Sequence, residues 1–147
     1  MEVNLKRLES TLHTAEVIYL STSVGDVVSS RPVSPLNIGP RLFVRTSAAT
    51  RKAKEMTANP NIAVCAGNFY FTGKAKPLGY VYDDANAEIK EAYMAHYPDS
   101  FGKEDEFIQS DEVFFELMME NVSEWVFDNG NPIGFSEQHF CPEALGE

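Results

Sequence analysis

The chain has 147 residues, of which 44% are hydrophobic and 23% are charged, a composition that is ordinary for a globular protein. This length fits a single domain, residues 1–147, and it is long enough for a hydrophobic core. No apolar run reaches 18 residues, which argues against a transmembrane helix, and the net charge of −10 argues against a nucleic-acid partner.

The first predicted element is a short amphipathic helix over residues 4–15, in which leucines recur at spacings of three and four. Residues 17–23 are β-branched and apolar and predict a strand, and Gly25-Asp26 predicts a turn. The returning strand over residues 27–36 contains two prolines, which require an edge position, a bulge or an irregular exit. A third strand is expected over residues 41–46.

A second helix is expected next, with Ser47 as its N-cap and residues 48–58 as its body. Asn59-Pro60 ends this helix, because the residue before a proline avoids the helical conformation. Residues 61–67 and 69–82 then predict two further strands.

The second half of the chain predicts a helix over residues 84–96 and a hairpin with strands over residues 112–119 and 121–128. A polar, acidic tail over residues 136–147 follows. About seven strands and three helices, with the strands consecutive at the front, favour an α+β domain, an antiparallel barrel with helices outside.

Charge is distributed unevenly along the chain. Residues 27–82 contain eight of the twelve basic residues and a single acid, Glu55, so this stretch carries about +7 within an acidic protein. A local positive field of this kind indicates an anionic ligand of limited size, and a phosphate group is the obvious candidate.

The predicted phosphate site lies where the strand over residues 41–46 passes into the second helix. Helix N-termini bind phosphate because their first N–H groups lack partners and carry a partial positive charge. Hydroxyl and basic side chains gather at this corner: Thr46, Ser47, Thr50, Arg51 and Lys52, with Arg31 on the neighbouring strand. Alternatively, the basic residues of the helix form a solvated face, but basic residues in a first turn oppose the helix dipole.

These motifs resemble those of the pyridoxamine 5′-phosphate oxidase-like FMN-binding split barrels. The resemblance covers residues 15–82 best and rests on four motifs: Arg31-Pro32-Val33, Thr46-x3-Thr50-Arg51-Lys52, Asn59-Pro60 and Gly73-Lys74-Ala75. It implies an antiparallel split β-barrel of about six to seven strands with flanking helices. It also implies FMN as the cofactor and a homodimer with two FMN sites at the subunit interface.

The resemblance implies roles for individual residues. Arg31, Arg51 and Lys52 would bind the FMN phosphate, assisted by Thr46 and Thr50. The backbone that follows Pro32, at Val33 and Ser34, would pass beside the isoalloxazine ring. Asn68 occupies the position of a glutamine that reaches FMN from the other subunit, and Trp125 occupies that of a tryptophan close to the flavin. Trp125 could instead be an aromatic residue of the core or of the dimer interface.

The sequence also departs from the oxidases. After Trp125, residues 128–135 contain neither the arginine nor the histidine that binds the phosphate of the pyridoxal substrate. A second phosphate-binding lysine of the oxidases is replaced by Leu36, and Asn68 is shorter than the family's glutamine. We therefore expect the flavin site without the vitamin B6 substrate site.

The function expected from the sequence is a flavin-dependent oxidoreductase with a small-molecule substrate, in which NAD(P)H reduces FMN and a small acceptor is then reduced. Three alternatives remain: a non-catalytic FMN carrier or sensor, a deazaflavin or haem protein on the same fold, and a split barrel without a cofactor. The catalytic residues and the acceptor are unknown from the sequence.

Metal binding and location are the remaining expectations. His139-x-Cys141, with His13 or His96, lacks the fixed ligand spacing of a metal site, so we expect none, although some split barrels bind haem through a tail histidine such as His139. No secretory signal pattern and no Cys-x-x-Cys motif is present, which favours a cytoplasmic protein with reduced thiols.

Overall fold

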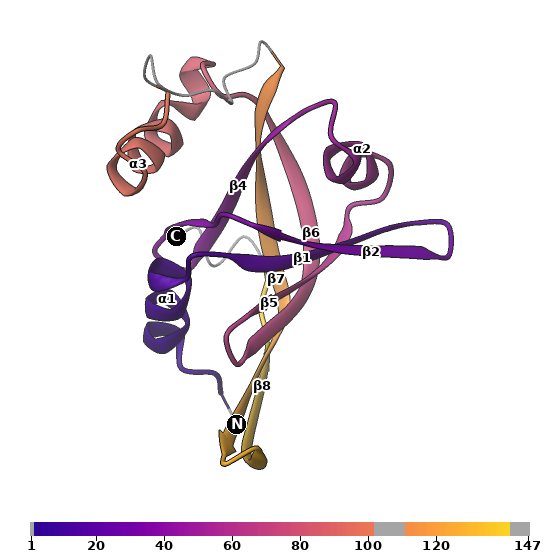
Figure 1. The fold of residues 1–147 in the computed structure, drawn as a ribbon, viewed down its shortest axis with the longest axis vertical. Helices are drawn as coiled ribbons and strands as arrows, with labels where there is room; N and C mark the ends of the chain where they lie inside the picture. The colour runs from indigo at the N-terminus through magenta and orange to yellow at the C-terminus, as the bar shows by residue number, and fades with distance from the viewer. Residues whose placement is uncertain (1, 102–110, 142–147) are drawn as a thin grey trace.

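The fold is an antiparallel sheet of eight strands that curves into an open barrel, with helices packed around it (Figure 1). A computed structural model describes residues 2–101 and 111–141. The strands are β1 (Ile18–Val24), β2 (Val27–Val33), β3 (Leu36–Ile38), β4 (Arg41–Ser47), β5 (Asn61–Ala66), β6 (Phe69–Tyr80), β7 (Glu112–Asp128) and β8 (Asn131–His139). The helices are α1 (Leu5–Thr14), α2 (Arg51–Ala58) and α3 (Ala87–His96), and the short 3-10 helix η1 (Asp84–Asn86) precedes α3.

The strand order explains the split form of the barrel. The strands follow the order β2-β1-β5-β6-β7-β4-β3, and β8 pairs with β7 off this path. Strand β7 is long enough to pair with β4 near its start, with β6 along its middle and with β8 near its end. The α+β split-barrel class predicted from the sequence is confirmed.

The predicted late hairpin was wrong. Residues 112–128 form one continuous strand, because no turn signal stands between Met119 and Asn121 and the chain pairs with β6 on both sides of this point. A register shift against β6 near Thr72 and Gly73 absorbs the irregularity at this point. The true hairpin turn lies at Asn129 and Gly130, which both have positive φ angles. The first residues of the predicted polar tail therefore belong to β8, and residues 142–147 lie outside the described part of the chain.

The prolines have the predicted effect on the early strands. Pro32 lies in β2, an edge strand that pairs only with β1, and an edge strand tolerates the missing N–H of a proline. Pro35 separates β2 from the short strand β3, where a single strand over residues 27–36 was expected. This break turns the chain at Ser34 and Pro35, close to the cavity described below.

Two groups of buried side chains hold the fold together. The larger group lies inside the barrel, and α1 closes it with Leu8 and Leu12, which are both 1% exposed. The smaller group lies under α3 and contains Phe43, Tyr93 and Phe114. In the described part of the chain, no helix is long and apolar enough to cross a membrane.

Candidate functional site

An open cavity of about 430 Å³ lies between the end of β2, the end of β4 and the start of α2. Seven residues proposed from the sequence line it: Pro32, Val33, Ser34, Thr46, Ser47, Thr50 and Lys52. Three further residues complete the lining: Arg45, Tyr93 and Glu112. The volume falls within the range of small-molecule sites, which is roughly 300–1,000 Å³.

The start of α2 differs from the prediction. The N-cap is Thr50, whose hydroxyl oxygen accepts a hydrogen bond from the backbone N–H of Ala53 at 3.3 Å. Ser47 instead donates to a carboxylate oxygen of Asp111 at 2.7 Å and holds the turn before the helix. The Oγ1 atoms of Thr46 and Thr50 are 2.9 Å apart, so strand end and helix start are joined by hydroxyl groups. The helix begins three residues later than expected, and Arg51 and Lys52 therefore occupy its first turn.

Lys52 is the basic residue of α2 that faces the cavity. Its partial burial lowers the pKa of its ammonium group, and the positive charge of Arg31 lowers it further, while the carboxylate of Glu112 raises it. An anion in the cavity would stabilise the charged form of Lys52. The electrostatic arrangement of this wall therefore favours a negatively charged ligand.

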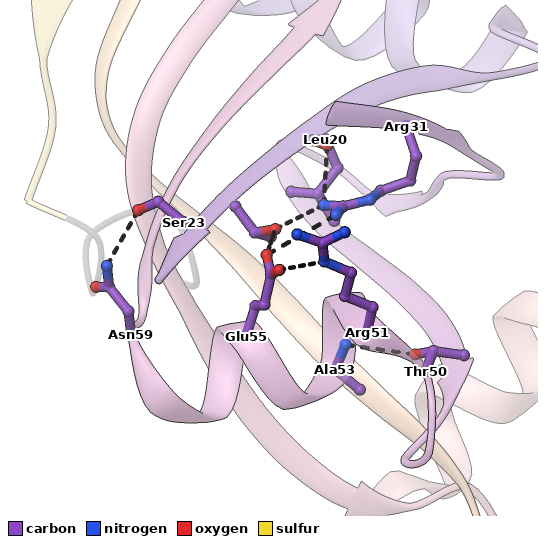
Figure 2. A network of polar contacts seen from close by, with 9 residues as sticks. Leu20, Ser23, Arg31, Thr50, Arg51, Ala53, Glu55 and Asn59 are labelled. Carbon is purple, nitrogen blue, oxygen red and sulfur yellow. Dashed lines mark hydrogen bonds and ion pairs between the residues drawn. The ribbon is translucent and has the colours of Figure 1, made fainter. Parts of the chain in front are cut away.

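Arg31 and Arg51, which directly precede the cavity residues Pro32 and Lys52 in the sequence, contact a carboxylate of the same chain (Figure 2). Arg51 and this carboxylate line a separate hollow together with Lys54. The Nε atom of Arg51 donates to Glu55 Oε1 at 2.6 Å, and Arg31 Nη2 lies 3.9 Å from Glu55 Oε2. Thr22 donates its hydroxyl to Glu55 Oε2 at 2.5 Å and accepts a bond from Arg31 Nη1 at 2.7 Å. Neither arginine lines the cavity in this arrangement.

Glu55 is held as a carboxylate. The hydrogen bond from Thr22 lowers the pKa of Glu55 most, and the bond from Arg51 adds to this effect against the opposing cost of burial. The side chain of Glu55 is 10% exposed, whereas that of Arg51 is 68% exposed. Arg51 therefore uses one edge of its guanidinium group for Glu55 and presents the rest to solvent.

The opposite wall of the cavity is built by β4, β7 and α3. Arg45 and Glu112 form an ion pair at 3.3 Å with side chains 8% and 7% exposed, and the Arg45 guanidinium lies 5.7 Å from the ring centre of Tyr93. Tyr97 donates its hydroxyl to the carbonyl of Pro35 at 2.5 Å, and burial raises the pKa of Tyr97 to about 12, so that the donor stays protonated. Tyr97, the residue that follows α3, thereby holds the turn that leads out of β2.

Asn68 and Trp125 lie together, but away from the cavity. The backbone N–H of Trp125 donates to the carbonyl of Asn68 at 3.0 Å, and the Trp125 ring lies 4.5 Å from that of Phe135, centre to centre. The β7–β8 hairpin that carries Trp125 extends to the lower end of Figure 1, whereas α2 lies in the upper half. Trp125 is 37% exposed, so it is not a core residue. Within one chain, neither Asn68 nor Trp125 lines the cavity.

Several site residues escaped the sequence analysis. Glu55 had a signal that was not used, since it is the single acid of the basic segment and stands four residues after Arg51, a spacing that pairs side chains on a helix. Tyr93 and Glu112 reach the cavity through packing of distant elements, which no local pattern indicates. Leu36, at the position of the missing lysine, is 3% exposed in the smaller core group and contributes no polar atom.

The described residues contain no cluster of three or more potential metal ligands among histidine, cysteine and acidic side chains. His139 Nδ1 lies 2.9 Å from Asn121 Oδ1 on the neighbouring strand, at an exposed position. Cys65, on β5, is also exposed.

Solved structures with the same fold are numerous, although no protein-family model and no curated protein sequence matches this chain. A pyridoxamine 5′-phosphate oxidase-like protein of Listeria innocua matches with a TM-score of 0.65 at 19% identity, over 80% of this chain and 94% of its own. An FAD-binding protein of Mesorhizobium loti matches with a TM-score of 0.59 at 16% identity, over 82% and 92% of the two chains.

A haem-binding protein of Mycobacterium smegmatis matches with a TM-score of 0.69 at 14% identity, over 97% of this chain and 61% of its own longer chain. At these identities the likeness concerns the fold. Proteins that share this architecture thus include both a flavin binder and a haem binder.

Proposed function

The chain has the split-barrel fold of the pyridoxamine 5′-phosphate oxidase-like proteins, and on that basis we propose that it binds FMN in the cavity between β2, β4 and α2. The observation that carries the proposal is the cavity itself, which combines the partly buried Lys52 with the hydroxyl groups at the start of α2. Phosphate monoesters are recognised by such combinations of charge, hydroxyl groups and helix N-termini.

The residues present fit FMN at both ends of the cavity. Lys52, Thr46 and Thr50 would hold the phosphate, with Arg31 and Arg51 adjacent. Val33 and Tyr93 provide apolar surface, and the backbone of Ser34 provides polar groups, for the flavin ring system. The side chains would thus bind and orient the cofactor and limit the access of water to it.

When bound, FMN would supply the hydride chemistry, with NAD(P)H as the proposed donor and a small molecule as the acceptor. This chain would act as a flavin-dependent oxidoreductase whose selectivity depends on the walls of the cavity. The Arg45–Glu112 pair and Tyr93 would border the space left for the substrate.

The test is an absorbance spectrum of the protein after incubation with FMN and desalting, with deazaflavin and haem offered in parallel. We expect retained flavin bands with FMN and, in the same sample, oxidation of NADH or NADPH in the presence of an acceptor. Retained flavin without turnover would favour a carrier or sensor. Retention of haem alone would favour the haem-binding alternative, which the fold of the mycobacterial protein supports.

Lys52 predicts how FMN affinity depends on pH. Because the pKa of Lys52 is lowered, its positive charge is lost at a lower pH than that of an ordinary lysine, whose pKa is about 10.4. We therefore expect the FMN dissociation constant, measured by flavin fluorescence from pH 7 to 10, to increase with pH. Lys52→Arg keeps its charge over this range and should abolish the increase. An equal increase in Lys52→Arg would refute the role of Lys52.

We further propose that the site is completed in a homodimer. Asn68 and Trp125 lie away from the cavity of their own chain, and exposed apolar residues flank them: Phe127, Ile133 and Phe135. A second copy could bring this hairpin to the cavity and bury its aromatic surface.

Light scattering should give twice the chain mass of 16.4 kDa, and Trp125→Ala should weaken FMN binding without unfolding the protein. The exposed Ile133→Ala serves as a control for loss of apolar surface on the same hairpin. A monomer that binds FMN at full strength would refute the shared site.

A further inference from the structure

Glu55 places one negative charge among the basic residues next to the proposed anion site, where it pairs with Arg31 and Arg51 (Figure 2). Two guanidinium groups and one ammonium group lie near one another, and Glu55 is the carboxylate among them. The other charged residues around this group cancel one another. Asp111, which binds Ser47, is negative and the exposed Lys54 is positive, and Arg45 and Glu112 form an ion pair.

The position of Glu55 is built by three elements. Helix α2 carries Glu55 one turn after Arg51, β1 supplies the hydroxyl of Thr22, and β2 supplies Arg31. Arg31 is fixed further by its bond to the carbonyl of Leu20 at 3.3 Å. The carboxylate is nine-tenths buried and bonded on both oxygens, so it cannot turn away to solvent when an anion approaches.

A carboxylate in this position has two consequences for a ligand. It separates the like charges of Arg31 and Arg51 and orders them side by side, which prepares their remaining N–H groups for an anion. It also cancels one positive charge, so that Arg31, Arg51 and Lys52 together with Glu55 carry about +2 instead of +3.

We infer that Glu55 is a specificity-determining residue, which matches the site to the roughly two negative charges of a phosphate monoester and disfavours ligands with a second ionised phosphate. This inference rests on the proposed binding of a phosphate-bearing cofactor in the adjacent cavity. The energy of a fixed charge near a ligand grows with the charge of the ligand, so Glu55 repels a diphosphate more than a monophosphate.

The experiment measures how inorganic phosphate and pyrophosphate raise the unfolding temperature of the wild-type protein and of Glu55→Gln at constant ionic strength. The concentration dependence of this increase gives the affinity for each anion. The glutamine keeps the size of the side chain and can still accept the bond from Arg51. Glu9→Gln removes the same charge from a partly exposed position on α1, outside this group of charges, and serves as the matched control.

For the wild-type protein we expect pyrophosphate to bind no more than about threefold more tightly than phosphate. In Glu55→Gln, phosphate should bind about threefold more tightly than before and pyrophosphate about tenfold or more, because removing one negative charge beside the site favours the more highly charged ligand. Glu9→Gln should behave as the wild type.

Two results would overturn the inference. The first is a wild-type protein that binds pyrophosphate at least tenfold more tightly than phosphate, a result that does not depend on whether Glu55→Gln folds. The second is a Glu55→Gln variant in which the affinities for phosphate and pyrophosphate change by the same factor. If FMN still binds in either case, the proposed function stands without the role of Glu55. A wild-type protein that binds neither phosphate nor FMN would refute both.

Discussion

Replacing Gly73 by alanine is expected to destabilise the protein by more than about 2 kcal/mol, because there is no room for a side chain at this point of the sheet. A Cβ atom on Gly73 would lie 1.9 Å from the backbone oxygen of Met118 and 2.9 Å from its carbonyl carbon. These atoms belong to β7, which pairs with β6 here, so the obstacle is backbone and cannot rotate away. Urea unfolding followed by circular dichroism measures the change.

Gly134→Ala is the matched control for this prediction. Gly134 also lies in the sheet, on β8, but its Cβ would meet only the side chain of Val126 at 3.5 Å, an ordinary contact. We expect Gly134→Ala to change the free energy of unfolding by less than about 1 kcal/mol. Equal stability of the two variants would contradict the close approach of β6 and β7 at the bulge.

Replacing Lys52 by alanine is expected to weaken FMN binding by about 1.5–3 kcal/mol, the usual contribution of a hydrogen bond to a charged group. This corresponds to a loss of roughly tenfold to 150-fold in affinity. Lys52 lines the cavity and its charge is partly buried, so water does not replace it readily. Titration of flavin fluorescence measures the dissociation constant.

The control for Lys52 stands two residues further along the same helix. Lys54 is exposed and does not line the cavity, so Lys54→Ala should reduce FMN affinity by about threefold at most, through the general field of the protein. Circular dichroism should show both variants folded. Equal losses in the two variants would mean that the affinity depends on the net charge of α2 rather than on a contact with Lys52.

The fold was predictable from the sequence where local patterns carry the information. Prolines and turn residues separated β1, β2 and β4, and Asn59-Pro60 ended α2 as expected. The pattern failed at β7, because a bulge changes the alternation of buried residues without a break in the strand. It also failed at the start of α2, where both Ser47 and Thr50 are good N-cap residues and only the packing against Asp111 decides between them.

The site was predictable in part, and for a similar reason. The hydroxyl residues of one strand–helix corner and Lys52 are close in sequence, so their convergence on the cavity follows from local structure. The pairing of Arg31 and Arg51 with Glu55 depends on Thr22, a residue of another strand. The position of Trp125 depends on how far β7 extends beyond β4, which no short segment encodes.

The central claim is that the cavity holds FMN by its phosphate, and a comparison of FMN with riboflavin tests it most directly. The two ligands share the flavin ring, and riboflavin lacks the phosphate group. Titration of flavin fluorescence with the wild-type protein should give at least tenfold tighter binding of FMN, since a charge-assisted contact to Lys52 contributes about 1.5 kcal/mol or more. Equal affinities for FMN and riboflavin, or no binding of either, would contradict the account.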